Sequence, residues 1–174
     1  PERAPQPVAV DVARELRSFK PQVAEAQAEA FDASPANIDA RTQRSTLPSG
    51  MKVALLPKST RGQAVKANLT KRFGTAAKLR DWVVTPEALA ALLDKGTAEL
   101  SRQQFQDRLD ALQAEVGFAA GPGQIQVSMS TRREHLPELV RLVSQALRRP
   151  SLPASSLEEV RRQALASVAE QRKE

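Results

Sequence analysis

The residues on either side of the Gly-Pro-Gly sequence at 121–123 constrain the fold of this chain more than any others. After this sequence, Ile125, Val127 and Met129 are apolar, and a glutamine or serine lies at each position between them. Alternation with a period of two predicts a β-strand with one buried face. The turn sequence predicts that this strand forms a hairpin with a strand that begins at Gly117.

An amphipathic helix is predicted directly after this hairpin. Residues 133–148 carry apolar side chains at helical spacing, and Pro150 ends the pattern. The predicted stripe consists of Leu136, Leu139, Val140, Val143 and Leu147. A hairpin with one apolar face, followed by a helix with an apolar stripe, favours packing of the helix on the sheet.

Further strands are predicted before the hairpin. Residues 38–46 have the pattern of an extended segment, residues 47–50 (Leu-Pro-Ser-Gly) form a turn, and residues 51–57 form a strand. Apolar and polar side chains alternate again between residues 65 and 70, which predicts a half-buried strand. We expect these segments to pair with one another as a hairpin or meander.

Two helices are predicted between these strands and the hairpin. The first runs from Thr85, a suitable N-cap, to Gly96, a suitable C-terminal residue. The second begins with Ser101 and Gln104, which have the spacing of a capping box, and extends to Val116.

A last helix is predicted from Ser156 to the end of the chain. Its apolar face contains Leu157, Val160, Ala164 and Val168. The order of strands and helices predicts an α+β fold, a two-layer sandwich with a mostly antiparallel sheet and helices packed on one face. Residues 1–36 are rich in Pro, Ala, Glu and Gln, which predicts a linker or connecting arm before a domain at residues 37–174.

Basic side chains are concentrated in residues 41–80. The net charge of the chain is +6, and this segment holds ten basic residues and no acidic one. Three interpretations remain open: the wall of a substrate chamber, a nucleic-acid groove, or a solvated face of a sheet. Nucleic acid is disfavoured because Phe73 is the only aromatic residue in the segment and the chain has no tyrosine. The basic residues are Arg41, Arg44, Lys52, Lys58, Arg61, Lys66, Lys71, Arg72, Lys78 and Arg80.

The side-chain inventory excludes several chemistries. Cysteine is absent and His135 is the only histidine. A protein zinc site normally takes three or four ligands, mostly His and Cys, so this chain lacks the donors for one. A Ser-His-Asp triad has only His135 available, and that residue lies in a charged stretch without a nucleophile elbow. No run of about 18 apolar residues predicts a membrane span.

Three segments together resemble the pitrilysin/insulinase family of zinc peptidases, which includes the mitochondrial processing peptidases. They are residues 47–57 (LPSGMKVALLP), residues 92–97 (LLDKGT), and the hairpin with the helix after it. The similarity extends from Ala36 to Glu174. It implies the fold of one repeat of that family, and the repeat continues beyond the last predicted helix. We therefore expect residues 37–174 to be truncated at their C-terminal end relative to a complete repeat.

In active members of that family an H-x-x-E-H motif precedes the stretch that matches LLDKGT. By this alignment the first zinc ligand falls on Glu87, the general base on Ala90 and the second ligand on Ala91. The third ligand, a glutamate on a later helix, falls on Ser167, and a supporting carboxylate falls on Val160. The resemblance therefore implies a non-catalytic repeat with a degenerate motif, which binds neither metal nor cofactor itself. Zinc would be held by an active partner half.

Members of the family consist of homologous halves that close around an unfolded peptide. The resemblance implies that this chain is the inactive half or part of it, with residues 1–36 as the connector between halves. Its partners would be a catalytic zinc-peptidase half, fused or separate, and the peptide substrate, which a strand edge and the basic residues Lys66, Lys71 and Arg72 would contact. Two-half bacterial members are commonly exported, which favours the periplasm. The alternative hypothesis is a basic binding module for nucleic acid or another anionic polymer.

Overall fold

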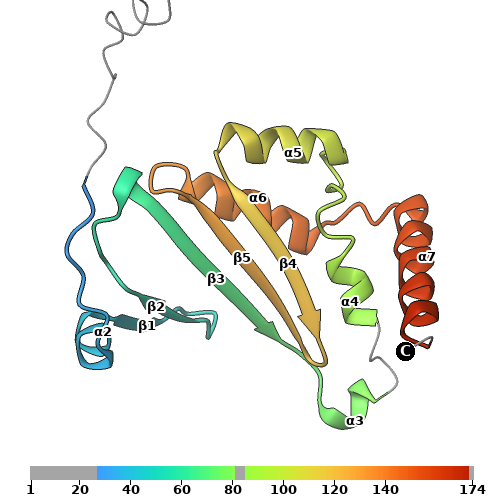
Figure 1. The fold of residues 1–174 in the computed structure, drawn as a ribbon, viewed down its shortest axis with the longest axis horizontal. Helices are drawn as coiled ribbons and strands as arrows, with labels where there is room; N and C mark the ends of the chain where they lie inside the picture. The colour runs from blue at the N-terminus through green and yellow to red at the C-terminus, as the bar shows by residue number, and fades with distance from the viewer. Residues whose placement is uncertain (1–26, 81–84, 173–174) are drawn as a thin grey trace, which may run out of the picture.

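The computed structural model describes residues 27–80 and 85–172 (Figure 1). Most of the predicted arm, residues 1–36, lies outside the described residues, and the predicted boundary near Ala36 falls within the first described helix. In chain order the elements are α2 (Pro35–Arg41), β1 (Gln43–Thr46), β2 (Lys52–Leu55), the short 3-10 helix η1 (Arg61–Gln63), β3 (Ala64–Arg72), α3 (Ala76–Leu79), α4 (Thr85–Ala90), α5 (Arg102–Ala111), β4 (Glu115–Gly121), β5 (Gln124–Arg132), α6 (Leu136–Arg148) and α7 (Ala154–Gln171).

The main sheet contains β3, β5 and β4, with β5 in the centre and all pairs antiparallel. One row of side chains crosses all three strands, because Leu69 and Phe118 both lie opposite Val127. Val127 is 1% exposed and Met129 is 8% exposed, whereas the serine between them is exposed. The hairpin around residues 121–123 and the buried face of β5 are therefore confirmed.

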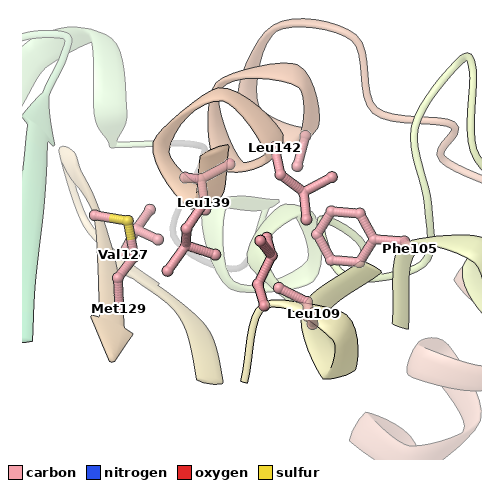
Figure 2. Packing of buried hydrophobic residues seen from close by; sticks show 9 residues of the cluster. Phe105, Leu109, Val127, Met129, Leu139 and Leu142 are labelled. Atoms are coloured by element: carbon pink, nitrogen blue, oxygen red, sulfur yellow. The ribbon is translucent and has the colours of Figure 1, made fainter. Parts of the chain in front are cut away.

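Helices α5 and α6 supply the apolar side chains that cover one face of this sheet. The buried cluster contains Phe105, Leu109, Leu112, Val127, Met129, Leu139, Leu142, Val143 and Ala146 (Figure 2). The opposite face of the sheet carries charged, polar and small side chains that are exposed or half-buried. This arrangement confirms the predicted α+β fold, with a mostly antiparallel sheet and helices on one face.

The buried stripe of α6 differs from the predicted one. Leu142 and Ala146 are buried, whereas Val140 is 47% exposed. The buried positions of α6 follow the spacing i, i+3, i+4, i+7 from Leu139. Residues at this spacing lie on one side of a helix, and that side packs on the sheet. The prediction that included Val140 was wrong because that side chain lies on the solvent side of the stripe.

Helix α5 begins as predicted and ends earlier. The Ser101 hydroxyl accepts the Gln104 N–H and the Gln104 side chain accepts the Ser101 N–H, so the capping box is complete. The helix ends at Ala111 because Gln113 takes a left-handed conformation with φ 47°, which no helix continues. Val116, predicted as the last helical residue, lies in β4. Helix α4 also ends early, at Ala90, and turns lead from it to Gly96.

The β1–β2 hairpin forms a separate two-stranded sheet. Two predictions are corrected here. Residues 38–41 belong to α2, which Ser34 caps by accepting the Asn37 N–H, and not to an extended segment. The meander is also wrong, because β3 pairs with β5 along nine residues instead of with the four-residue β2. Pairing with β5 places Val65, Ala67 and Leu69 on the covered face of the main sheet, which β2 does not offer.

Helix α7 extends over Ala154–Gln171, close to the prediction, but none of its residues is buried. Val160 is half-buried, whereas Leu157 is 46% and Val168 is 52% exposed. Its predicted apolar face is therefore largely uncovered within the described residues. No described helix has both the length and the apolar character needed to cross a membrane.

Candidate functional site

Helices α4 and α7 carry the positions that correspond to a zinc site in the resemblance, and they contact each other (Figure 1). Glu87 and Ala90 lie in α4, Ala91 follows its last residue, and Val160 and Ser167 lie in α7. The structure thus brings together the two elements that the sequence placed far apart. Glu87, Ala91 and Ser167 are exposed, Val160 is half-buried and Ala90 is 5% exposed.

The side chains on these two helices offer little chemistry. The methyl groups of Ala90 and Ala91 and the isopropyl group of Val160 have no lone pair to donate to a metal ion. The Ser167 hydroxyl is a poor zinc ligand in comparison with imidazole or carboxylate. In residues 27–80 and 85–172, no three His, Cys, Asp or Glu side chains lie close enough together to hold a metal ion. The chain's one histidine, His135, precedes α6, and its Nε2 lies 3.5 Å from the Glu134 carboxylate.

The two outer strands of the main sheet, β3 and β4, each pair on one side only within the described residues. The backbone groups on their outer sides are therefore available for an added strand. Helix α4 lies beside β4, while no helix forms a comparable contact with β3 within the described residues. Of these two edges, β3 is thus the less obstructed.

The predicted substrate contacts Lys66, Lys71 and Arg72 all lie on β3 and are exposed. Lys66 lies opposite Ser130 and Arg72 opposite Gln124, so both belong to the open face of the sheet. Lys71 lies opposite Ile125 and therefore belongs to the other face. The structure groups two of the three predicted cations on one face, about 20 Å apart along the strand.

Lys66 and Arg72 have no ion-pair partner among the described residues, and no carboxylate lies opposite either of them in the ladder with β5. On the open face, Glu115 of β4 lies in the same row as Lys66, with Ser130 of β5 between them. These two cations are consequently available to an anionic ligand.

Other members of the basic segment hold local structure instead. The Arg41 guanidinium lies 2.9 Å from the Glu29 carboxylate and donates to the Pro57 carbonyl oxygen at 2.7 Å. The Phe31 ring lies between Arg41 and Lys58, with its centroid 5.3 Å from Cζ and 4.8 Å from Nζ. Arg44 pairs with Asp39 at 2.7 Å. Sequence counting treated all ten cations alike, whereas the structure divides them between packing and an open face.

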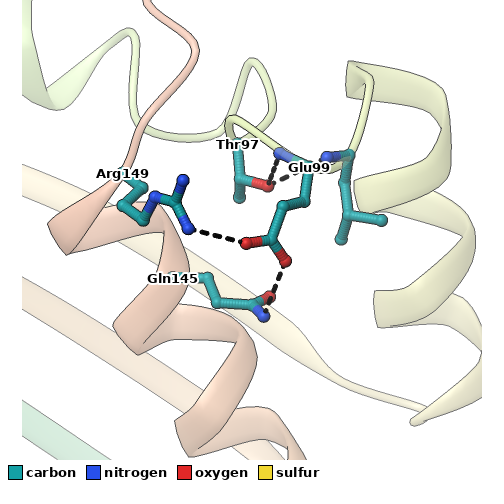
Figure 3. Close-up of polar contacts among 5 residues, drawn as sticks. Thr97, Glu99, Gln145 and Arg149 are labelled. Carbon is teal, nitrogen blue, oxygen red and sulfur yellow. Dashed lines mark hydrogen bonds and ion pairs between the residues drawn. The ribbon is translucent and has the colours of Figure 1, made fainter.

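A polar cluster fixes the loop between α4 and α5, and no sequence pattern predicted it (Figure 3). The Thr97 hydroxyl accepts the N–H groups of Glu99 at 3.2 Å and Leu100 at 3.0 Å. The Glu99 carboxylate lies 3.0 Å from the Arg149 guanidinium and accepts from Gln145 at 3.5 Å. The cluster joins the end of α6 to the loop that follows α4.

Comparison with known proteins tests these interpretations. No family model matches the chain, and no curated protein matches it. The chain does superpose on a crystal structure of a peptidase M16 inactive domain from Pseudomonas fluorescens, with a TM-score of 0.63 and 19% identity. The chain has the fold of that inactive domain. The match covers 76% of this chain and 32% of the other, so this chain spans about a third of the length of its structural neighbour.

This fold agrees with the resemblance found in the sequence and supports a relation to the M16 peptidases at the level of the fold. The neighbour is described as an inactive peptidase domain. At this identity the likeness concerns architecture, and the function of the present chain has to be argued from its own residues.

Proposed function

We propose that this chain is a non-catalytic domain of a zinc metalloprotease assembly, and that it holds an extended peptide beside a separate half that carries the zinc. One observation carries the proposal: the chain has the fold of an inactive peptidase domain, while Glu87, Ala90, Ala91, Val160 and Ser167 occupy the aligned catalytic positions. An α4–α7 pair of this composition retains the shape of a peptidase domain without its chemistry.

Peptide would be held at the edge of β3 by backbone hydrogen bonds. This mode needs an unpaired strand edge and no particular side chains, and β3 offers nine residues of it. Lys66 and Arg72, on the open face of the same strand, would favour peptides with carboxylates. The proposed partners are thus an unfolded, acidic peptide and a catalytic half that supplies zinc, either fused or separate.

The test is binding of the whole chain to two fluorescent ligands of equal length and charge, an unstructured acidic peptide and a single-stranded oligonucleotide, across a salt series. We expect the peptide to bind more tightly and with the weaker salt dependence. The double variant K66E/R72E should weaken peptide binding by about three- to tenfold, since each exposed ion pair contributes a fraction of a kcal/mol up to about 1 kcal/mol. The matched control R141E/R148E changes two exposed arginines on α6, with the same change in net charge, and should leave binding unchanged.

Preference for the oligonucleotide with a steep salt slope would overturn the proposal in favour of the anionic-polymer module. Cleavage of peptide by the isolated chain, inhibited by a chelator, would overturn the non-catalytic assignment. Equal effects of R141E/R148E and K66E/R72E would show that net charge, and not β3, governs binding.

A further inference from the structure

The helices cover the apolar face of the main sheet less completely at β3 than at β5. Val127 is 1% exposed, whereas Leu69 opposite it is half-buried. Met129 is 8% exposed, whereas Ala67 opposite it is half-buried, although Ala67 and Leu69 both pack against the core cluster. Figure 1 shows α4 and α7 on the β4 side of the sheet, away from β3. The apolar layer thus ends at β3 with side chains that solvent still reaches.

The two faces of β3 differ in chemistry. The covered face carries the apolar side chains of Val65, Ala67 and Leu69, with Lys71 at its end. The open face carries the polar and charged side chains of Lys66, Asn68, Thr70 and Arg72. A chain that pairs with the free edge of β3 would place alternate residues beside these two rows. Since a slip of one residue exchanges the two faces, the edge can distinguish one parity of a peptide from the other.

The charges of the open face indicate which side chains belong on that parity. Among the strand residues of this face, Lys66 and Arg72 of β3 and Arg132 of β5 are cationic, and Glu115 of β4 is the acidic one. Lys66 and Arg72 lie in the edge strand itself, so an added strand comes directly beside them, whereas Glu115 lies on the far strand. Because the two cations are six residues apart, they point to the same face. Two acidic residues six positions apart in an added strand would meet both of them.

We propose that the edge of β3 selects extended peptides with a two-residue alternation, apolar on the parity that faces the helices and acidic six positions apart on the other. This inference rests on the proposed peptide-holding function and names the class of peptide that it serves. Backbone pairing supplies affinity at any strand edge, and the side-chain rows supply specificity. Lys66 and Arg72 are the specificity-determining residues, whereas Lys71 lies on the covered face and does not read the acidic positions.

The test uses the full chain and three fluorescent peptides of equal length. The first has glutamates six positions apart, threonine between them on the same parity and valine on the other parity. The second has the same residues in an order that places the two glutamates on opposite faces of a strand. The third has the order of the first, with glutamine in place of both glutamates. We expect the first to bind about three- to tenfold more tightly than either of the others, because cross-strand pairs each add a small increment.

Two variants with the same loss of charge on the same strand locate the effect. Lys66→Gln should lower the preference for the first peptide over the glutamine peptide by about two- to threefold. The matched control Lys71→Gln removes a cation from the other face and should leave this preference unchanged. Both lysines are exposed, and thermal unfolding of each variant verifies that the fold is retained.

The possible failures separate this inference from the function on which it rests. Equal affinity of the first two peptides would remove the alternation, and equal affinity of the first and third would remove the role of the cations. An equal loss of preference in Lys66→Gln and Lys71→Gln would assign the effect to net charge. Each of these results overturns the inference and leaves peptide holding in place. Binding of none of the three peptides would overturn both.

Discussion

The main sheet and the β1–β2 hairpin are both antiparallel and both have one apolar face, yet only the main sheet buries it. Val127 of β5 is 1% exposed, whereas Leu55 of β2 is 56% exposed. The difference lies in the element that comes after each strand along the chain. Residues 133–135 connect β5 directly to α6, which folds back on the sheet, whereas β2 leads through η1 into another strand. An apolar face is buried when the chain supplies a second layer for it.

Substitution of one leucine in each region should give the largest difference in the free energy of unfolding. Leu139 is 0% exposed in the main core, so Leu139→Ala should lower the free energy of unfolding by about 2–5 kcal/mol through lost burial and a cavity. Leu55→Ala in the hairpin should change it by less than about 0.5 kcal/mol. Urea unfolding followed by circular dichroism measures both. Equal losses would mean that the hairpin face is covered in solution and that the contrast between the two regions is wrong.

Two threonines, one in the main sheet and one in the hairpin, test the same difference between the two regions through a hydrogen bond. Thr131 is 5% exposed, and its hydroxyl donates to the Leu112 carbonyl oxygen at 2.8 Å, which ties the end of α5 to β5. Thr131→Val should cost about 1–3 kcal/mol because the buried carbonyl loses its partner. Thr46→Val, at an exposed position of β1, should be close to neutral. A cost for Thr131→Val no larger than that for Thr46→Val would show that water replaces the lost donor.

The smallest expected effect is a pH dependence confined to the hairpin region. The Ser34 N–H and then the Ser34 hydroxyl donate to the Asp32 carboxylate, both at 2.8 Å, and lower the pKa of Asp32 from its ordinary value of 3.8. A lowered pKa in the folded state means that the contribution is complete above the unfolded-state pKa and is lost as the pH falls through the folded-state pKa. We expect acidification below about pH 4 to loosen the turn before α2 and to leave the core unchanged.

The amide signals of Ser34 and Val127, followed by NMR while the pH is lowered, measure this effect. Ser34 should shift with the titration of Asp32, and Val127 should not. In Asp32→Asn the shift of Ser34 in this range should disappear. A shift that persists in this variant would mean that another group titrates.

Local patterns predicted the elements whose signals lie within a few residues. The capping box of Ser101 and Gln104, the hairpin at 121–123 and the amphipathic helix after it were all confirmed, because neighbouring residues satisfy one another there. Helix α2 was missed, since Ser34 and Pro35 were assigned to an arm instead of an N-cap and a first helical residue. The end of α5 was missed because the left-handed conformation of Gln113 has no sequence signal when the residue is not glycine.

At the candidate site, Glu87 and Ala90 lie in α4, Val160 and Ser167 lie in α7, which contacts α4, and Ala91 follows the end of α4. The predicted substrate-contact cations are only partly grouped. Lys66 and Arg72 lie on the open face of the sheet, and Lys71 lies on the other. Parity along one strand predicts this division. Val65, Ala67 and Leu69 share the parity of Lys71, so the sequence alone already separated Lys71 from Lys66 and Arg72. The cluster of Thr97, Glu99 and Arg149 joins residues far apart in the chain and had no local signal.

The amino-acid sequence alone established the side-chain inventory of this chain. A count of one histidine and no cysteine holds in any fold, because folding changes the positions of side chains and not their identity. The sequence also established the alternation of each strand and most of the apolar stripes of the helices. The tertiary structure was needed to show that β3 pairs with β5, that α4 meets α7, and that the hairpin face stays open. Those outcomes depend on contacts between segments that lie far apart in the chain. Several segments could cover the same apolar surface, and the free energy of the whole fold determines which of them does.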